Sequence, residues 1–72
     1  MLQPPQRLSL VAQTAEILRK HIATCAAGEK LGSERELGYQ LGVSRMTLRA
    51  ALANLERERL IRAGQGRSHA VP

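Results

Sequence analysis

The stretch SERELGYQLGVSRMTLRAALANLERERL, residues 33–60, decides the fold of this 72-residue chain. It holds two amphipathic helical segments that meet at residues 41–43, and the second segment opens with Ser44 and Arg45. A tight turn between two helices, with arginines at the start of the second, is how a helix-turn-helix presents a recognition helix to the major groove of DNA. The pattern therefore predicts a unit of this type.

The first helical segment begins with a capping box at residues 33–36. In this motif the Ser33 hydroxyl accepts a hydrogen bond from the backbone N–H of Glu36, and the Glu36 carboxylate accepts one from the N–H of Ser33. Leu37 and Leu41 give the short helix a single apolar face. We therefore expect a helix that starts sharply after Ser33.

Two glycines mark the passage from the first helix to the second. Gly42 follows the last turn of the first helix, where a left-handed C-cap needs a residue without a Cβ. Gly38 lies where a bulky side chain would hold the two helices apart. Val43 is expected to reach into the core, and Ser44 is expected to cap the second helix.

The second helix is predicted for residues 45–58, with the DNA-facing end in its N-terminal half. Its buried stripe is predicted to consist of Leu48, Ala51, Leu52 and Leu55. Arg45 and Arg49 are four residues apart and point the same way, off that stripe. Ala50 and Ala53 are small and also lie away from it, so this face can approach a groove closely.

The segments on either side complete a small domain. Residues 1–7 are predicted to form a flexible N-terminal arm, and residues 8–72 the folded domain. Apolar residues recur at three- and four-residue steps over 9–24, which predicts an amphipathic helix capped by Ser9. Its apolar positions are Leu10, Val11, Thr14, Leu18 and Ile22, with Ala15 and Ile17 beside them. Residues 29–31 suit one short extended segment.

The C-terminal residues suit a wing, which is a pair of short strands around a glycine-rich turn. We expect strands at residues 60–63 and 67–71, joined by a turn at 64–66. Gly66 would let the tip enter a minor groove, with Arg67 or His69 beside it. Arginine gains from the enhanced negative potential of a narrow minor groove. The alternative is a disordered basic tail.

Composition limits the other possibilities. The formal net charge is +5, and residues 45–72 hold six arginines against two glutamates. Charge alone suits a polyanionic partner and a merely solvated surface equally, but a basic patch on a recognition-type helix favours the polyanion. Cys25 is the single cysteine, so the chain forms no internal disulfide and suits a reducing cytoplasm. We interpret it as a small buried hydrophobe. The sequence lacks a signal peptide and any apolar run of the ~20 residues that span a membrane.

The sequence resembles the N-terminal winged helix-turn-helix domain of the GntR family of bacterial transcription regulators over residues 8–71. The resemblance is carried by residues 33–37, 41–45, 47–49, 51–52, 55–56, 60–61 and 65–67, together with Leu31. It implies a mainly α fold, with a three-helix core and a two- or three-stranded β-wing. It also implies binding to double-stranded DNA at an operator half-site, with no cofactor, metal or membrane.

The family's DNA contacts carry over onto matching positions. They imply DNA binding by Arg35, Ser44, Arg45, Thr47, Arg49 and Gly66. Met46, Gln65 and Arg67 are added as neighbours of these positions on the recognition helix and at the wing tip. The family also implies a cytoplasmic homodimer for the full-length protein, whose C-terminal effector-binding domain is absent from this chain. We expect an excised domain rather than a complete small regulator, because residue 72 falls at the expected boundary.

The sequence departs from the family pattern at several places. Gly32 stands where the family has proline, which predicts a less rigid entry to the capping box. Arg59 replaces the glycine that ends the recognition helix, which predicts a different helix end. Residues 68–70 replace a Gly-Thr-Phe run, so we expect a poorly packed second wing strand. The linker between the first two helices is about two residues short.

Two other classes of function compete with DNA binding. Catalysis would need a nucleophile beside a base, paired carboxylates or a metal cluster, and the sequence suggests none of these. A winged helix can also serve as a protein–protein docking module. The outward pair Arg45 and Arg49 argues against docking, since docking surfaces usually replace the arginines of the recognition helix. The sequence therefore predicts a DNA-binding domain and not an enzyme.

Overall fold

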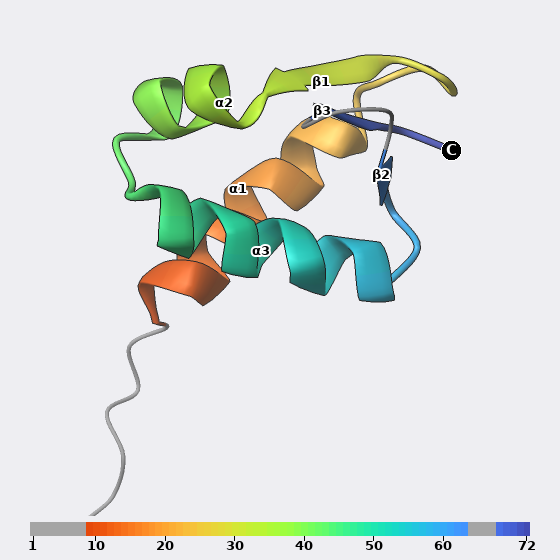
Figure 1. The fold of residues 1–72 in the computed structure, drawn as a ribbon. Helices are drawn as coiled ribbons and strands as arrows, with labels where there is room; N and C mark the ends of the chain where they lie inside the picture. The colour runs from red at the N-terminus through yellow and green to blue at the C-terminus, as the bar shows by residue number, and fades with distance from the viewer. Residues whose placement is uncertain (1–8, 64–67) are drawn as a thin grey trace, which may run out of the picture.

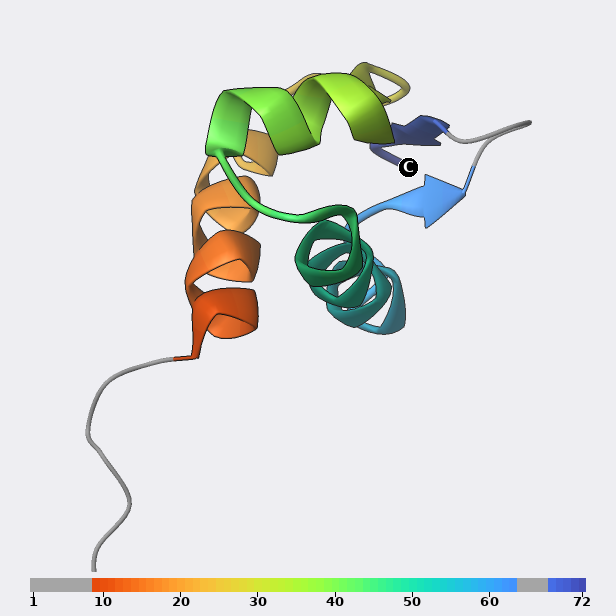
Figure 2. The same ribbon diagram turned by 60° about the vertical axis from the view of Figure 1, so that its left-hand side comes forward.

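Three helices and a small antiparallel sheet form the computed structural model, which describes residues 9–63 and 68–72. Helices α1 (Leu10–Ile22), α2 (Glu34–Leu41) and α3 (Arg45–Arg57) surround one core, and the sheet lies near the C-terminal end of α3 (Figures 1 and 2). The predicted winged helix-turn-helix fold is confirmed. The proposed arm, residues 1–7, lies outside the described residues.

The sheet takes the three-stranded form of the predicted wing. Its order is β1 (Lys30–Ser33), β3 (Ser68–Ala70), β2 (Arg62–Ala63), so β3 is the central strand and is antiparallel to both neighbours. The register of β1 shifts between Lys30 and Gly32. Because β1 runs directly into α2 (Figure 1), the sheet joins the wing to the first helix of the helix-turn-helix.

Gly32 adopts a backbone conformation that proline cannot reach. Its φ is +105°, whereas the proline ring holds φ near −65°. The glycine lies at the shift in register, where an irregular strand needs this freedom. Replacement of the family's proline therefore changes the path of the chain into α2, and does more than loosen it.

The helices pack through aliphatic side chains of modest size, as the near absence of aromatic residues requires. The buried apolar residues are Ala15, Leu18, Ile22, Leu31, Leu37, Leu48, Ala51, Leu52, Leu55 and Ile61. The predicted stripe of α3 is fully confirmed, with Leu48 and Leu55 at 0% exposure. The extended segment predicted near residue 30 is also confirmed, and its Leu31 belongs to this core.

Helix α1 begins as predicted and ends slightly earlier. The Ser9 hydroxyl accepts a hydrogen bond from the backbone N–H of Ala12 at 3.0 Å. The helix ends at Ile22, and Thr24 lies in the following turn. The predicted apolar face is wrong at Leu10 and Ile17, which are 55% and 54% exposed. Leu10 is the first residue of the helix, where the neighbouring helices no longer cover it.

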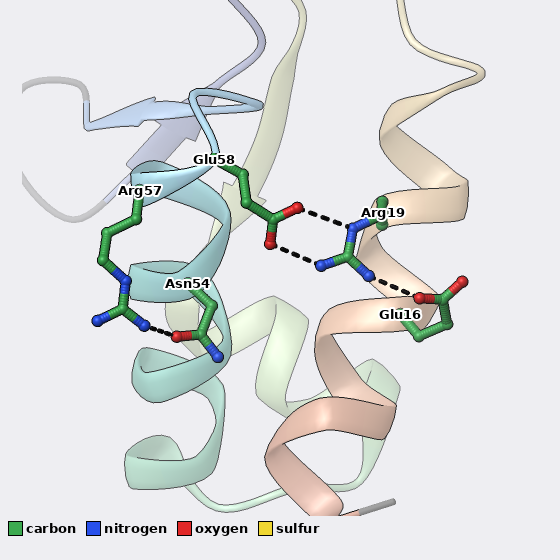
Figure 3. Close-up of polar contacts among 5 residues, drawn as sticks. All are labelled: Glu16, Arg19, Asn54, Arg57 and Glu58. Carbon is green, nitrogen blue, oxygen red and sulfur yellow. Dashed lines mark hydrogen bonds and ion pairs between the residues drawn. The ribbon is translucent and has the colours of Figure 1, made fainter.

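An ion-pair cluster fastens α1 to the end of α3 (Figure 3). Arg19 donates from Nε and Nη2 to the two carboxylate oxygens of Glu58, at 3.1 Å and 2.6 Å. Its Nη1 donates to Glu16 at 2.6 Å. A guanidinium that pairs with a carboxylate through two bonds fixes orientation as well as distance. The cluster therefore adds a polar contact between α1 and the residue that ends α3, at the partly exposed edge of their packing.

Helix α3 ends in a left-handed turn built on an arginine. The backbone N–H of Leu60 donates to the carbonyl of Leu55, and that of Arg59 donates to Glu56, which is a Schellman motif. Arg59 has a φ of +63°. The helix thus closes as a glycine would close it, and the prediction of a different end was wrong. Unlike glycine, Arg59 has a Cβ, which comes close to the following carbonyl oxygen in this left-handed conformation and strains the backbone.

This strain gives a prediction for Arg59→Gly. A left-handed conformation costs an L-residue roughly 1–2 kcal/mol, and the greater unfolded-state entropy of glycine offsets about 0.5–1 kcal/mol of that. We expect Arg59→Gly to raise the free energy of unfolding by about 0.5–1 kcal/mol in urea titrations. Arg59→Ala removes the same charge but keeps the Cβ, so it should bring no gain. Equal free energies of unfolding for the two variants would contradict the claim that Arg59 is strained.

The Arg19–Glu58 pair gives a prediction on pH. The hydrogen bonds from Arg19 lower the pKa of Glu58 from its ordinary value of 4.5, and desolvation opposes them only in part. A carboxyl whose pKa is lowered by folding stabilises the protein above its unfolded pKa, and this contribution disappears as pH falls through the folded value. Wild type should thus exceed Glu58→Gln in stability at neutral pH, with the gap closing on acidification below 4.5.

The control for this prediction is Arg19→Gln, which leaves Glu58 in place without its partner. The Glu58 carboxyl followed by NMR should then titrate close to its ordinary value. A Glu58 resonance that titrates identically in wild type and Arg19→Gln would show that the pair does not perturb this group.

Candidate nucleic-acid interface

The turn between α2 and α3 is held by backbone hydrogen bonds from two successive residues. Gly42 is left-handed, at φ +67°, and its N–H donates to the carbonyl of Gly38 at 2.9 Å. The N–H of Val43 donates to the same carbonyl at 3.2 Å. Val43 then packs against the core, as predicted. These contacts fix where α3 begins, and hence which of its residues come first.

Ser44 and Thr47 form the start of α3 together. The N–H of Thr47 donates to the Ser44 hydroxyl at 3.1 Å, and the Ser44 hydroxyl donates to that of Thr47 at 3.0 Å. Ser44 is thus the N-cap that the sequence predicted. The Ser44 hydroxyl makes both of these contacts, whereas the Thr47 hydroxyl makes one of them. The two residues therefore differ in what they offer to a ligand.

Helix α3 presents a smooth basic face opposite its leucine stripe. Arg45 and Arg49 are both exposed, and Met46 beside them is 83% exposed. Ala50 and Ala53 are exposed too and add no bulk to this side. This surface matches the face that the sequence predicted for the N-terminal half of the helix.

Arg35 of α2 meets Arg45 of α3 at two shallow hollows between the starts of the helices. One hollow measures about 200 Å³ and the other about 260 Å³, and both are lined by Glu34, Arg35 and Arg45. Neither arginine has an ion-pair partner within residues 9–63 and 68–72. The structure therefore gathers two of the predicted site residues, with their charges available.

Tyr39 is a surface residue that the sequence reasoning missed. It is 90% exposed and lines the larger hollow together with Arg35 and Arg45. The sequence could have indicated its exposure, because Tyr39 is the only aromatic residue of the chain and lies outside the apolar face of α2. A phenolic hydroxyl beside two free guanidinium groups is a suitable hydrogen-bond donor to an anionic oxygen.

Arg49 is held by Glu34, the first residue of α2. Its Nε donates to Oε1 of Glu34 at 3.0 Å. The side chain of Glu34 is 13% exposed and that of Arg49 is 52% exposed. The Glu34 carboxylate is thus largely covered by neighbouring residues, whereas the Arg49 guanidinium is exposed to solvent. The two residues are 15 positions apart, so no local pattern signals the contact.

The wing is anchored to the recognition helix by a histidine. His69 in β3 is 7% exposed, and its Nε2 lies 2.8 Å from Oε1 of Glu56 in α3. Val71 packs against the core. The expectation of a poorly packed second strand was therefore wrong, because the buried histidine fastens it without the family's aromatic residue. The predicted wing-tip residues Gln65, Gly66 and Arg67 lie outside the described residues.

Cys25 has the structural role that its isolation predicted. It is half-buried against the core, and its Sγ lies 3.4 Å from the carbonyl oxygen of His21. Burial raises the pKa of its thiol, with Glu29 adding to the effect, which disfavours the reactive thiolate. Within the described ranges, histidine, cysteine and acidic side chains form no cluster able to hold a metal. None of the described helices is long and apolar enough to cross a membrane.

Comparisons with known proteins agree with this geometry. The model of a family described as "Bacterial regulatory proteins, gntR family" matches residues 10–71. An uncharacterized HTH-type transcriptional regulator of Escherichia coli, YihL, is 71% identical over 31 residues, which are 43% of this chain. The match covers only 13% of the length of that protein.

Solved structures with this fold cover the chain more fully. The DNA-binding domain of AraR, crystallised in complex with an operator, superposes with a TM-score of 0.85 and 31% identity, covering 100% of this chain and 95% of that one. A GntR family transcriptional regulator from Listeria monocytogenes gives a TM-score of 0.79 at 28% identity, covering 94% of this chain and 62% of that one.

The turn before α3 predicts that alanine has different effects on stability at two glycines. At Gly42, φ is +67° and a Cβ would meet nothing within 4 Å, so Gly42→Ala should cost about 1 kcal/mol through backbone strain alone. At Gly38 a Cβ would lie 3.5 Å from the Val43 carbonyl, an ordinary contact. Gly38→Ala should then be neutral or stabilise the protein by up to ~1 kcal/mol, the helical preference of alanine.

Urea unfolding of the two variants measures this contrast. Each adds one methyl group to the same helix–turn segment, so each is the control of the other. If both variants lost stability equally, the left-handed turn at Gly42 would not be the feature that sets the start of α3.

Proposed function

The chain belongs to the gntR family of bacterial regulatory proteins, and we propose that it binds a specific operator half-site in double-stranded DNA. Residues 44–58 lie in the major groove in this proposal, and the wing, residues 62–71, lies at the adjacent minor groove. The observation that carries the proposal is the exposed, basic and otherwise smooth N-terminal face of α3. A major groove admits one helix, and a helix with small outward side chains approaches the base edges closely.

The arginines divide by position into two roles. Arg45 and Arg49 point outward from the first two turns of α3, where a recognition helix meets base edges. An arginine in that place pairs bidentately with guanine. Arg35 lies on α2, at the rim of the hollow beside Arg45, and suits a phosphate. Base contacts by the first pair would specify the sequence, and the phosphate contact would position the domain.

The remaining site residues follow from the same placement. Thr47 and Ser44 suit backbone phosphates at the start of α3, where the helix N-terminus favours an anion. Met46 is exposed on the same face and suits an apolar contact such as a thymine methyl. Tyr39 suits a phosphate beside Arg35. For the wing tip, Gln65, Gly66 and Arg67 stay proposed minor-groove contacts.

The AraR domain supports a DNA partner. It was crystallised with an operator and is 31% identical to this chain across its whole length. We extend this to the longer protein that such domains belong to, and propose a homodimer that reads two half-sites of one operator in the cytoplasm. Dimers of helix-turn-helix proteins bind half-sites about one helical turn apart. A protein-docking role finds less support, since Arg35 and Arg45 are without ion-pair partners in the described ranges.

The experiment begins with selection of bound sequences from a random duplex pool by the 72-residue chain. The selected duplex and a random duplex then serve as paired probes in fluorescence anisotropy. We expect Arg45→Ala to weaken binding to the selected duplex by about 10- to 100-fold, which is the ~1–3 kcal/mol of one bidentate pair. Binding to random DNA should fall far less.

The matched control is Arg62→Ala, which removes one exposed arginine from β2, at the base of the wing and outside the recognition helix and the proposed wing tip. It should weaken binding to both duplexes alike, through the electrostatic attraction that every basic residue contributes. Equal losses on selected and random DNA in Arg45→Ala would contradict base reading by α3. Failure of the wild-type chain to select any sequence would contradict the proposed function itself.

A further inference from the structure

Glu34 is the acidic residue at the centre of the basic surface. It lines both hollows with Arg35 and Arg45, and its carboxylate accepts the hydrogen bond from Nε of Arg49. An acidic group in such a place lowers the attraction of the surface for phosphate. Support of the α2 N-terminus does not require it to contact α3, since any carboxylate in that first turn, such as Glu36, complements the dipole.

The hydrogen bond leaves the part of Arg49 that reads bases free. Glu34 takes Nε, and Nη1 and Nη2 of Arg49 make no hydrogen bond or ion pair with residues 9–63 or 68–72. A guanidinium has five donors in one plane, so fixing Nε fixes the direction of the two terminal groups. Those two groups are free to form a bidentate pair with one guanine.

The position of Glu34 is itself fixed. Ser33 ends β1 and caps α2 through the bond from the N–H of Glu36 to its hydroxyl, at 3.1 Å. Glu34 follows directly, and its side chain is 13% exposed. The lower effective dielectric around a largely covered carboxylate strengthens its attraction to the guanidinium relative to a pair at the open surface. The contact thus joins a rigid part of α2 to a long side chain of α3 that would otherwise move freely.

We propose that Glu34 is a positioning residue that holds the Arg49 guanidinium in the orientation needed for base reading. In this role Glu34 lowers the affinity for DNA of any sequence and raises the discrimination between the selected sequence and others. This inference rests on the proposed function. Glu34 separates Arg49 from Arg35 and Arg45 electrostatically, and its negative charge weakens binding to any duplex. Its gain is that Arg49 loses less conformational freedom on meeting the correct base. The opposite possibility, a brake that withholds Arg49 from DNA, predicts the reverse change in discrimination.

Glu34→Gln tests the proposal, with Glu36→Gln as the matched control. Both variants remove one negative charge from the first turn of α2, and Glu36 makes no ion pair with the described arginines. The measured quantity is the ratio of affinities for the duplex that wild type selects and for a random duplex. We expect Glu34→Gln to lower this ratio roughly tenfold, within the range that one bidentate base contact contributes. Glu36→Gln should leave it unchanged.

Combination with Arg49→Ala identifies the path of the effect. If Glu34 acts through Arg49, Glu34→Gln should change the ratio no further in the Arg49→Ala background. A ratio in Glu34→Gln equal to that in Glu36→Gln, or one that rises as a brake requires, would overturn the inference while leaving the proposed function intact. A wild-type chain that selects no sequence would overturn both.

A spectroscopic measurement covers the case in which Glu34→Gln does not fold. The Nε–Hε signal of Arg49 in the wild-type chain should be protected from solvent exchange, both free and with the selected duplex bound. Release of this proton to solvent on binding would overturn the positioning role, because Glu34 would then hold Arg49 only in the absence of DNA.

Discussion

The burial of the leucine stripe of α3 is the contact on which the rest of the molecule depends. Leu48, Leu52 and Leu55 are the most completely buried large side chains, with at most 1% of their surface exposed. Their packing fixes the rotation of α3 about its own axis, and rotation decides which side chains face outward. Because the stripe faces inward, Arg45 and Arg49 face outward. The proposed recognition surface is therefore a consequence of how the core packs.

Polar contacts then place this helix against its neighbours at both ends. The Ser44 cap and the left-handed Gly42 define its start, and the contact of Arg49 with Glu34 joins that start to α2. At the far end, Arg19 and Glu58 join it to α1. The basic surface lies at the start of α3. There the carboxylate of Glu34 offsets the mutual repulsion of the neighbouring arginines. In the proposed function, the residues that read the DNA sequence are thus among those that hold α3 in place.

Local patterns could be predicted from the sequence, and distant pairings could not. The caps at Ser9, Ser33 and Ser44 and the turn at Gly42 depend on residues within four positions of one another, so each has a recognisable signature. Apart from Glu16 and Arg19, which lie three residues apart in α1, the paired residues are 13 to 39 positions apart, a separation that no local window covers. Departures from the family pattern were also misjudged, because a sequence states that Arg59 replaces glycine but not that the backbone keeps the glycine's conformation.

The most direct test of the account is an NMR titration of the isotopically labelled chain with the duplex that it selects. The account predicts that the largest changes in chemical shift fall on residues 44–49 and Arg35, including the side-chain Nε signals of the arginines. Changes concentrated instead in the groove of about 430 Å³ between α1 and α3, around Ala12, Glu16 and Arg57, would contradict it. That result would assign the binding surface to the opposite side of the recognition helix.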